Sequence, residues 1–231
     1  MQGGLKALQA ASLTDADIQE YVHQYITQLD AQSPVLGSND NYVKRLQRIT
    51  AGLTQVDGVP LNFKVYKTNE VNAFACADGS VRVYTGLMDL MNDNEVLGVI
   101  GHEIGHVALK HTKKEMQAAM LASAGMDALA STNENVAVLT QSQLGAIGET
   151  ILNAQYSKKQ ESAADDYAYD FLKKAGKSPA CLAAGLQKLQ SLENSSNGST
   201  SSLAYKLFSS HPDTEARILR VKQRLAQDGI K

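Results

Sequence analysis

The chain has 231 residues, of which 43% are hydrophobic and 20% charged. This length and composition suit one sizeable hydrophobic core, and they exclude a collagen, a mostly disordered chain and a disulfide-dense miniprotein. Lys and Arg number 22 against 24 Asp and Glu, which gives a formal net charge of −2. Because such a chain has no global basic field, we expect no nucleic-acid partner.

Apolar residues near the N-terminus recur with the spacing of one helix face. A helix is predicted from Thr14, which forms a capping pair with Asp17, and a second one from about Ser38. Over residues 61–85 apolar and polar residues alternate around Asp78-Gly79, a pair typical of a tight hairpin turn, so we expect a small antiparallel sheet there. The rest of the chain is predicted to be helical, over 93–111, 114–130, 134–153, 155–175, 179–193 and 212–227.

No stretch reaches the roughly eighteen continuous apolar residues that a transmembrane helix needs. The N-terminal residues lack the charged, apolar and small-residue succession of a signal peptide. We therefore expect a soluble protein, which is either cytosolic or a mature form without its targeting segment. A lipid anchor or an outer-membrane association is not visible in the sequence.

The sequence HEIGH over residues 102–106 indicates a metal site. Histidines four positions apart share one helix face and can converge on one ion, and Glu103 then lies beside a bound water molecule. Gly98, Gly101 and Gly105 interrupt the same helix, and their spacing indicates that another backbone or a substrate strand approaches closely. The alternative is a buried helix whose histidines only form hydrogen bonds.

A catalytic zinc site needs a third protein ligand and leaves a fourth position for water. The best candidates are Glu161 and Asp165, because they are four residues apart on one predicted helix and face the same way. Glu161 would bind the metal, and Asp165 would accept a hydrogen bond from the outer nitrogen of a ligand histidine. The alternative for this pair is a solvated acidic helix face.

Four segments together resemble the zinc metallopeptidase family of HtpX and the CAAX prenyl proteases. They are Val71–Ala75, Gly101–His106, Glu161–Asp165, and Ser210–Pro212 together with Arg217. Within that family the pattern is most similar to the soluble periplasmic branch of LoiP- and BepA-like proteases. The resemblance implies a periplasmic zinc endopeptidase. It also implies a zincin-type (gluzincin) fold of the α+β, mainly α class, with the small antiparallel sheet beside the HExxH helix.

The resemblance also implies roles for individual residues. One Zn²⁺ per chain would be bound by His102, His106 and Glu161, with Glu103 as the general base that activates water. Asp165 is sometimes assigned a proton-donor role in this family, whereas its spacing favours support of a ligand histidine.

His211 is the candidate donor to the oxyanion of the tetrahedral intermediate, and Arg217 is a weaker one. Alternatively, His211 occupies the fourth zinc position and holds the enzyme inactive until substrate displaces it, or it only caps a helix. The remaining histidines, His23 and His111, are interpreted as structural or surface residues, since His111 lies five residues past His106 and off the ligand face.

Substrate binding is expected at an exposed edge strand over residues 71–77. Asn72, Ala73 and Phe74 match the family there, and Arg217 is a further candidate contact. A peptide added to such an edge is extended, so we expect cleavage of extended or misfolded proteins in envelope protein quality control. One alternative is an ordinary hairpin strand. At the level of function, the alternative is a chaperone-like module that binds unfolded chains with a structural or idle metal.

We expect a single metallopeptidase domain over residues 1–231. Two cysteines are too few to indicate the compartment. In an oxidising periplasm Cys76 and Cys181 would form a disulfide or remain free thiols, and both outcomes stay open. The expected parts of the domain are N-terminal helices, a small sheet, zinc-site helices and C-terminal helices, over 1–56, 61–85, 93–175 and 179–231.

Overall fold

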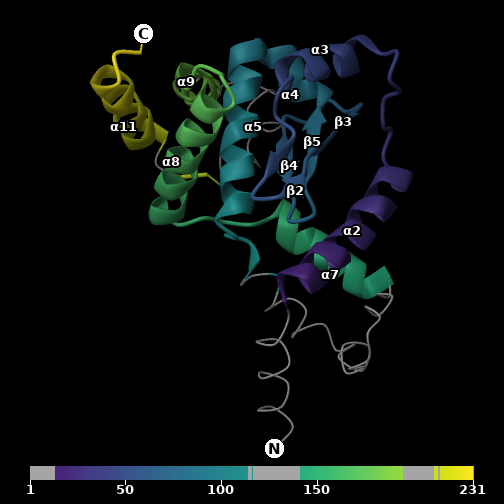
Figure 1. The fold of residues 1–231 in the computed structure, drawn as a ribbon. Coiled ribbons are helices and arrows are strands. Elements are labelled where there is room, and N and C mark those ends of the chain that lie inside the picture. The colour runs from purple at the N-terminus through teal and green to yellow at the C-terminus, as the bar shows by residue number, and fades with distance from the viewer. Residues whose placement is uncertain (1–13, 114–115, 117–140, 195–210, 213, 231) are drawn as a thin grey trace, which may run out of the picture.

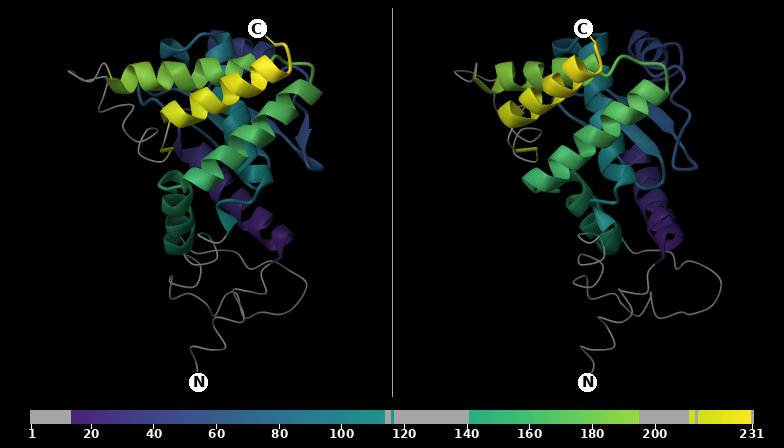
Figure 2. Two further views of the ribbon diagram at one scale, coloured as in Figure 1. Left: turned by 90° about the vertical axis from the view of Figure 1, so that its left-hand side faces the viewer. Right: turned by 60° about the vertical axis from the view of Figure 1, so that its left-hand side comes forward.

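The computed structural model describes residues 14–113, 116, 141–194, 211–212 and 214–230. Helix α5 (Asp93–Ala108) runs through the centre, between a small sheet on one side and helices α8 (Lys158–Lys174), α9 (Ala180–Asn194) and α11 (Thr214–Gln227) on the other (Figure 1). Turned views show α9 and α11 side by side (Figure 2). This arrangement confirms the α+β, mainly α class.

The long helices begin where the sequence offers a capping side chain. Capping boxes at Thr14, Asn92 and Ser157 precede α2 (Asp15–Gln32), α5 and α8, and they satisfy backbone N–H groups that the first helical turn leaves free. Among the described helices, none combines the length and apolarity needed to cross a membrane. Apart from Met116, the expected helix over 114–130 lies outside the described residues, and so do residues 134–140 of the next one. The remaining helices are α3 (Asn41–Ile49), α4 (Thr85–Leu90) and α7 (Gln141–Leu152).

The central sheet has three strands in the order β3-β5-β4. The predicted hairpin at Asp78-Gly79 joins β4 and β5, with Gly79 at a φ of 83°. The expectation of a purely antiparallel sheet is wrong, because β3 pairs parallel with β5. From β3 to β4 to β5 the strand direction alternates, so β3 and β5 run the same way. Because β5 inserts between β3 and β4, it pairs with β3 as a parallel neighbour. The strands are β3 (Asn62–Tyr66), β4 (Ala73–Ala75) and β5 (Ser80–Tyr84), and a separate hairpin pairs β1 (Gln55–Val56) with β2 (Val59–Pro60).

Both faces of the sheet are covered by helices. Val65 and Val83 belong to a cluster shared with α3 and α5, whereas Tyr66 and Phe74 belong to a second cluster shared with α2 and α7. A third cluster joins α8, α9 and α11. As a result, every residue of α5 from 96 to 106 is buried. The helix that carries the HEIGH segment is therefore the centre of the molecule.

The two cysteines do not form a disulfide in this structure. Cys76 and Cys181 are free, and they are buried in different hydrophobic clusters. Burial raises the pKa of both thiols, to about 12 for Cys181, so each behaves as a small apolar side chain.

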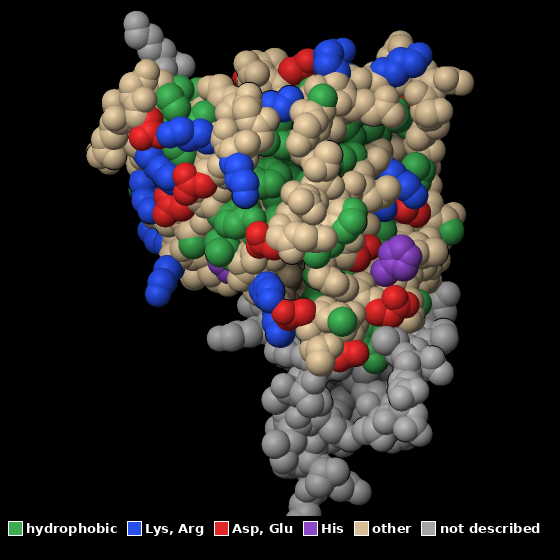
Figure 3. Space-filling model, in the orientation of Figure 1, with side chains coloured by type: hydrophobic (Ala, Val, Ile, Leu, Met, Phe, Trp, Pro, Cys, Tyr) green, Lys and Arg blue, Asp and Glu red, His purple; other side chains and the backbone are tan. Residues whose placement is uncertain are grey.

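Charged side chains of both signs are intermixed over α8 and α11 (Figure 3). They form ion pairs between the two helices, with Arg224 Nη2 at 2.5 Å from Asp170 Oδ1 and Arg220 paired with Asp166. The charges on this face therefore largely cancel, and exposed pairs of this kind contribute about 1 kcal/mol or less each.

Candidate active site

The HEIGH segment lies in the second half of α5. Ile100 and Ile104 are fully buried on the apolar side of this helix and hold it in the core. Because four residues make slightly more than one helical turn, His102 and His106 project from the same side. Both rings are buried, so they meet other protein groups and not bulk solvent.

Helix α8 places Glu161 against these histidines, and glycines permit the approach. A Cβ atom built on Gly105 would lie 2.5 Å from the carbonyl oxygen of Ala164 in α8. A Cβ atom on Gly98 would lie 2.1 Å from the carbonyl oxygen of Cys181 in α9. The close approach predicted from the glycine spacing is therefore confirmed; the partners are helix backbones at Gly98 and Gly105, whereas at Gly101 the nearest atoms belong to the Leu172 side chain.

Four side chains, those of His102, His106, Glu161 and His211, converge so that one donor atom of each lies within 4.8 Å of the others. His106 Nε2 is 3.0 Å from His102 Nε2 and 3.1 Å from Glu161 Oε1. Ligand atoms of a tetrahedral zinc ion are about 3.3 Å apart, given Zn–N bonds of about 2.0–2.1 Å. The two histidines and the glutamate thus fit a zinc ion in both donor type and spacing.

Behind the cluster, Asp165 and Arg217 hold its members in place. Asp165 Oδ1 is 2.8 Å from the outer nitrogen, Nδ1, of His102. Arg217 donates from Nε and Nη2 to Asp165, at 2.7 and 2.8 Å, and its Nη1 contacts Glu161. The guanidinium is buried, and its fork geometry fixes both carboxylates. These contacts favour a positioning role for Arg217, and its oxyanion and substrate-binding roles stay predictions.

His211, from the segment before α11, lies between Glu103 and the other three members of the cluster. Its Nδ1 is 3.2 Å from His102 Nε2 and 3.1 Å from Glu161 Oε1, and its Nε2 is 3.4 Å from Glu103 Oε1. Glu103 Oε1 is buried and has no hydrogen-bond partner among the described residues. Buried carboxylate oxygens are normally satisfied, so this atom is available to accept a proton from a molecule that enters the site.

Burial sets the protonation of two groups in the site. It raises the pKa of Glu103, which borders a hollow lined by apolar side chains such as Val99 and Leu182. It also lowers the pKa of His106 well below the usual range, which keeps this imidazole neutral and able to bind a metal.

Charge pairs dominate elsewhere in the site. Burial and Arg217 act to lower the pKa of His102, but Glu161 and Asp165 outweigh them and raise it to about 9. Burial would raise the pKa of Asp165, but Arg217 and His102 lower it to about 2. Asp165 is therefore a carboxylate that can accept the hydrogen bond from His102.

The residues expected to bind substrate lie on β4 and just before it. In the described part of the chain, no strand pairs with the outer edge of β4. Tyr84 N donates to Asn72 O and the register pairs Phe74 with Arg82, so Ala73 and Ala75 direct their main-chain groups away from β5.

The side chains of Asn72 and Phe74 limit how a substrate strand can bind at the outer edge of β4. Asn72 Oδ1 accepts the N–H of Ala73 at 2.9 Å and so occupies one outward donor. The Phe74 ring is buried edge-on against Tyr66 and Tyr84, so it belongs to the core. Because Phe74 pairs with Arg82, its main-chain groups face β5, so the outward main-chain groups of this edge belong to Ala73 and Ala75.

Two rings beside His106 were missed by the sequence analysis. His111 Nδ1 is 2.9 Å from His106 Nδ1, and the Tyr156 ring centroid is 3.7 Å from that of His106. The interpretation of His111 as a structural or surface residue off the ligand face assumes a helix that extends to residue 111, whereas α5 ends at Ala108. For Tyr156 the one available signal is its place immediately before the cap of the helix that carries Glu161.

The chain is similar to known proteases over most of its length. The sequence model described as peptidase family M48 matches residues 39–225. The chain is 44% identical to Metalloprotease LoiP of Escherichia coli strain K12, over 100% of this chain and 89% of that protein. It is 43% identical to Metalloprotease YcaL of the same strain, over 98% and 87%. Identity to the beta-barrel assembly-enhancing protease of that strain is 26%, over 88% of this chain and 42% of the relative.

Proposed function

Because the chain belongs to peptidase family M48 and is therefore a metalloprotease, we propose that it is a zinc-dependent endopeptidase for extended or misfolded polypeptides. The observation that carries the proposal is the convergence of His102, His106 and Glu161 from two helices beside a buried oxygen of Glu103 that has no hydrogen-bond partner among the described residues. Two histidines and a glutamate form a common donor set of catalytic zinc.

The chain's own residues divide the work of hydrolysis. Zinc, when bound, supplies Lewis acidity that lowers the pKa of water and polarises the scissile carbonyl. Glu103 accepts a proton from the attacking water on Oε1 and delivers it to the leaving amine. Asp165 and Arg217 keep His102 and Glu161 in their orientation throughout.

His211 is proposed as a group that takes the fourth ligand position and leaves it when substrate enters. The support is the placement of its Nδ1, which lies within 3.3 Å of both oxygens of Glu161 and of His102 Nε2. The alternative role is donation to the oxyanion, and substitution of His211 separates the two because they predict changes of activity in opposite directions.

Substrate is proposed to add a strand at the outer edge of β4. Ala73 and Ala75 direct main-chain groups there, and α5 packs against the same strand. Main-chain hydrogen bonds make few demands on substrate sequence, but they require an extended chain. Unfolded polypeptides satisfy this requirement, whereas tightly folded loops do not.

A periplasmic location and a role in envelope protein quality control complete the proposal. Their support is the resemblance of four segments to the periplasmic branch of the family. The name of one relative, beta-barrel assembly-enhancing protease, is compatible with an envelope role.

The test combines metal content with digestion of an unfolded casein. We expect about one zinc per chain, cleavage that a chelator abolishes, and a Glu103→Gln variant that keeps zinc but does not cleave. Glu149→Gln is the matched control, because Glu149 is an exposed helical glutamate away from the site. A zinc-loaded wild type that binds casein without cleaving it would contradict the proposal and indicate a chaperone-like module.

A further inference from the structure

Both histidines of the HEIGH segment have a partner at the ring nitrogen that faces away from the ligand cluster. His102 Nδ1 lies 2.8 Å from Asp165 Oδ1, and His106 Nδ1 lies 2.9 Å from His111 Nδ1. In both rings Nε2 is the atom within the cluster. A neutral imidazole that binds a metal through Nε2 carries its proton on Nδ1, so His106 donates and His111 accepts.

The end of α5 places His111 at this nitrogen. Lys110 N donates to Val107 O at 2.9 Å, and His111 N donates to His106 O at 3.0 Å, which is the bond pattern of a Schellman motif. Lys110 takes the left-handed conformation that this motif requires, with a φ of 55°. The chain therefore turns back over the last helical turn, and the His111 and His106 ring centroids are 4.9 Å apart.

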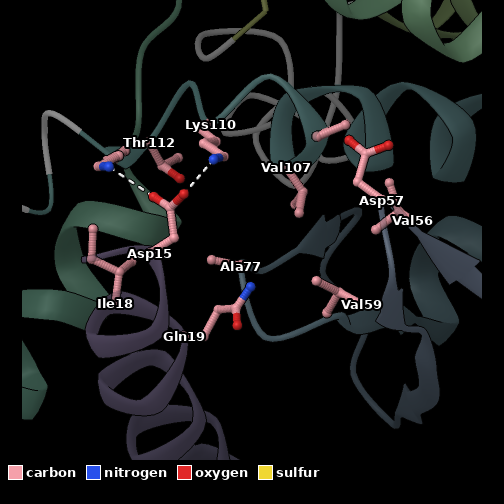
Figure 4. A pocket seen from close by; sticks show the side chains of 12 residues that line it. Asp15, Ile18, Gln19, Val56, Asp57, Val59, Ala77, Val107, Lys110 and Thr112 are labelled. Atoms are coloured by element: carbon pink, nitrogen blue, oxygen red, sulfur yellow. Dashed lines mark hydrogen bonds and ion pairs between the residues drawn. The ribbon is translucent and has the colours of Figure 1, made fainter.

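Ion pairs connect this turn to α2. Figure 4 looks into the pocket where Asp15 of α2 meets the residues that follow α5. Asp15 pairs with Lys110 and, at 2.7 Å, with Lys113, so it contacts the turn on both sides of His111. Tyr156 covers one face of the His106 ring, with centroids 3.7 Å apart. The His106 ring is thus fixed along one edge and one face.

We propose that His111 is a positioning residue for the metal site, which accepts the Nδ1–H of His106 and so orients this ligand as Asp165 orients His102. The inference rests on the metal assignment made above. Partners at the outer nitrogen of a ligand histidine fix its tautomer and orientation, and their loss typically weakens metal binding about 10–100-fold.

The experiment measures zinc affinity of the full chain by competition with a chromophoric chelator. His111→Phe keeps a ring but removes the acceptor, and we expect a zinc dissociation constant raised about 10–100-fold. His111→Asn offers an amide oxygen near the position of Nδ1, and we expect affinity within about threefold of wild type. His23→Phe is the matched control at an exposed histidine outside the site, with no expected change. The visible spectrum of the cobalt-loaded proteins gives a second readout, in which only the Phe variant departs from wild type.

Unchanged zinc affinity in His111→Phe would overturn the proposal, and so would an Asn variant that weakens binding as much as the Phe variant does. If His111→Phe does not fold, His111→Leu replaces it in the comparison with Asn. A wild type that binds no zinc would overturn both the metal assignment and this inference. By contrast, tight wild-type binding with insensitive His111 variants overturns this inference alone.

Discussion

Replacement of Gly105 by alanine tests whether the contact between α5 and α8 sets the geometry of the metal site. The new methyl group would lie 2.5 Å from the Ala164 carbonyl oxygen, whereas ordinary contact begins at 3.4 Å. Helix α8 must therefore retreat by about 0.9 Å, the difference between these distances, and it carries Glu161 one turn earlier. Metal sites tolerate deviations of about 0.2 Å, and a misplacement of about 1 Å can cost about 100-fold in rate.

The predicted result is a large loss of function with a small loss of stability. Overpacking costs about 1–3 kcal/mol, and the better helix propensity of alanine offsets about 1 kcal/mol of it, so the net destabilisation is about 2 kcal/mol or less. Zinc affinity and kcat/KM on a peptide substrate measure the loss of function, and urea unfolding measures the loss of stability. Gly145→Ala is the control, since nothing lies within 4 Å of a Cβ there. Wild-type zinc affinity and activity in Gly105→Ala would refute the reasoning.

Three further predictions concern other residues. His211→Ala should raise peptide cleavage if His211 occupies the fourth ligand position, whereas a fall of about 10²–10³-fold would instead identify an oxyanion donor. Arg217→Met should cost about 3–5 kcal/mol in urea unfolding, because it leaves two buried carboxylates without their cation, and a cost below about 1 kcal/mol would contradict the positioning role. Burial would raise the pKa of Asp30, but hydrogen bonds from Arg82, Lys64 and Tyr66 lower it below its usual value of 3.8. Its stabilising contribution should therefore be present above about pH 4 and be lost as the pH falls further, and urea unfolding of Asp30→Asn should show a flatter pH dependence in that range.

Local signals in the sequence predicted the elements that depend on neighbours a few residues apart. The capping box at Thr14, the Asp78-Gly79 hairpin and the helix that carries the HEIGH segment are all present. Each depends on hydrogen bonds or turn geometry within about five residues, so the sequence contains the whole interaction. The glycines of α5 likewise indicated a close approach, but not the identity of the partner.

The sequence alone determined which residue types were available for a metal site and that two of them share a helix face. Only the tertiary structure decided that Glu161 meets these histidines, that Arg217 lies behind the carboxylates, and that β3 runs parallel to β5. It also decided that the chain turns back at Lys110 and brings His111 onto His106. These contacts join elements that are distant in the chain, or they depend on where a helix ends. The packing of buried helices fixes these contacts, and the periodicity of the sequence does not predict that packing.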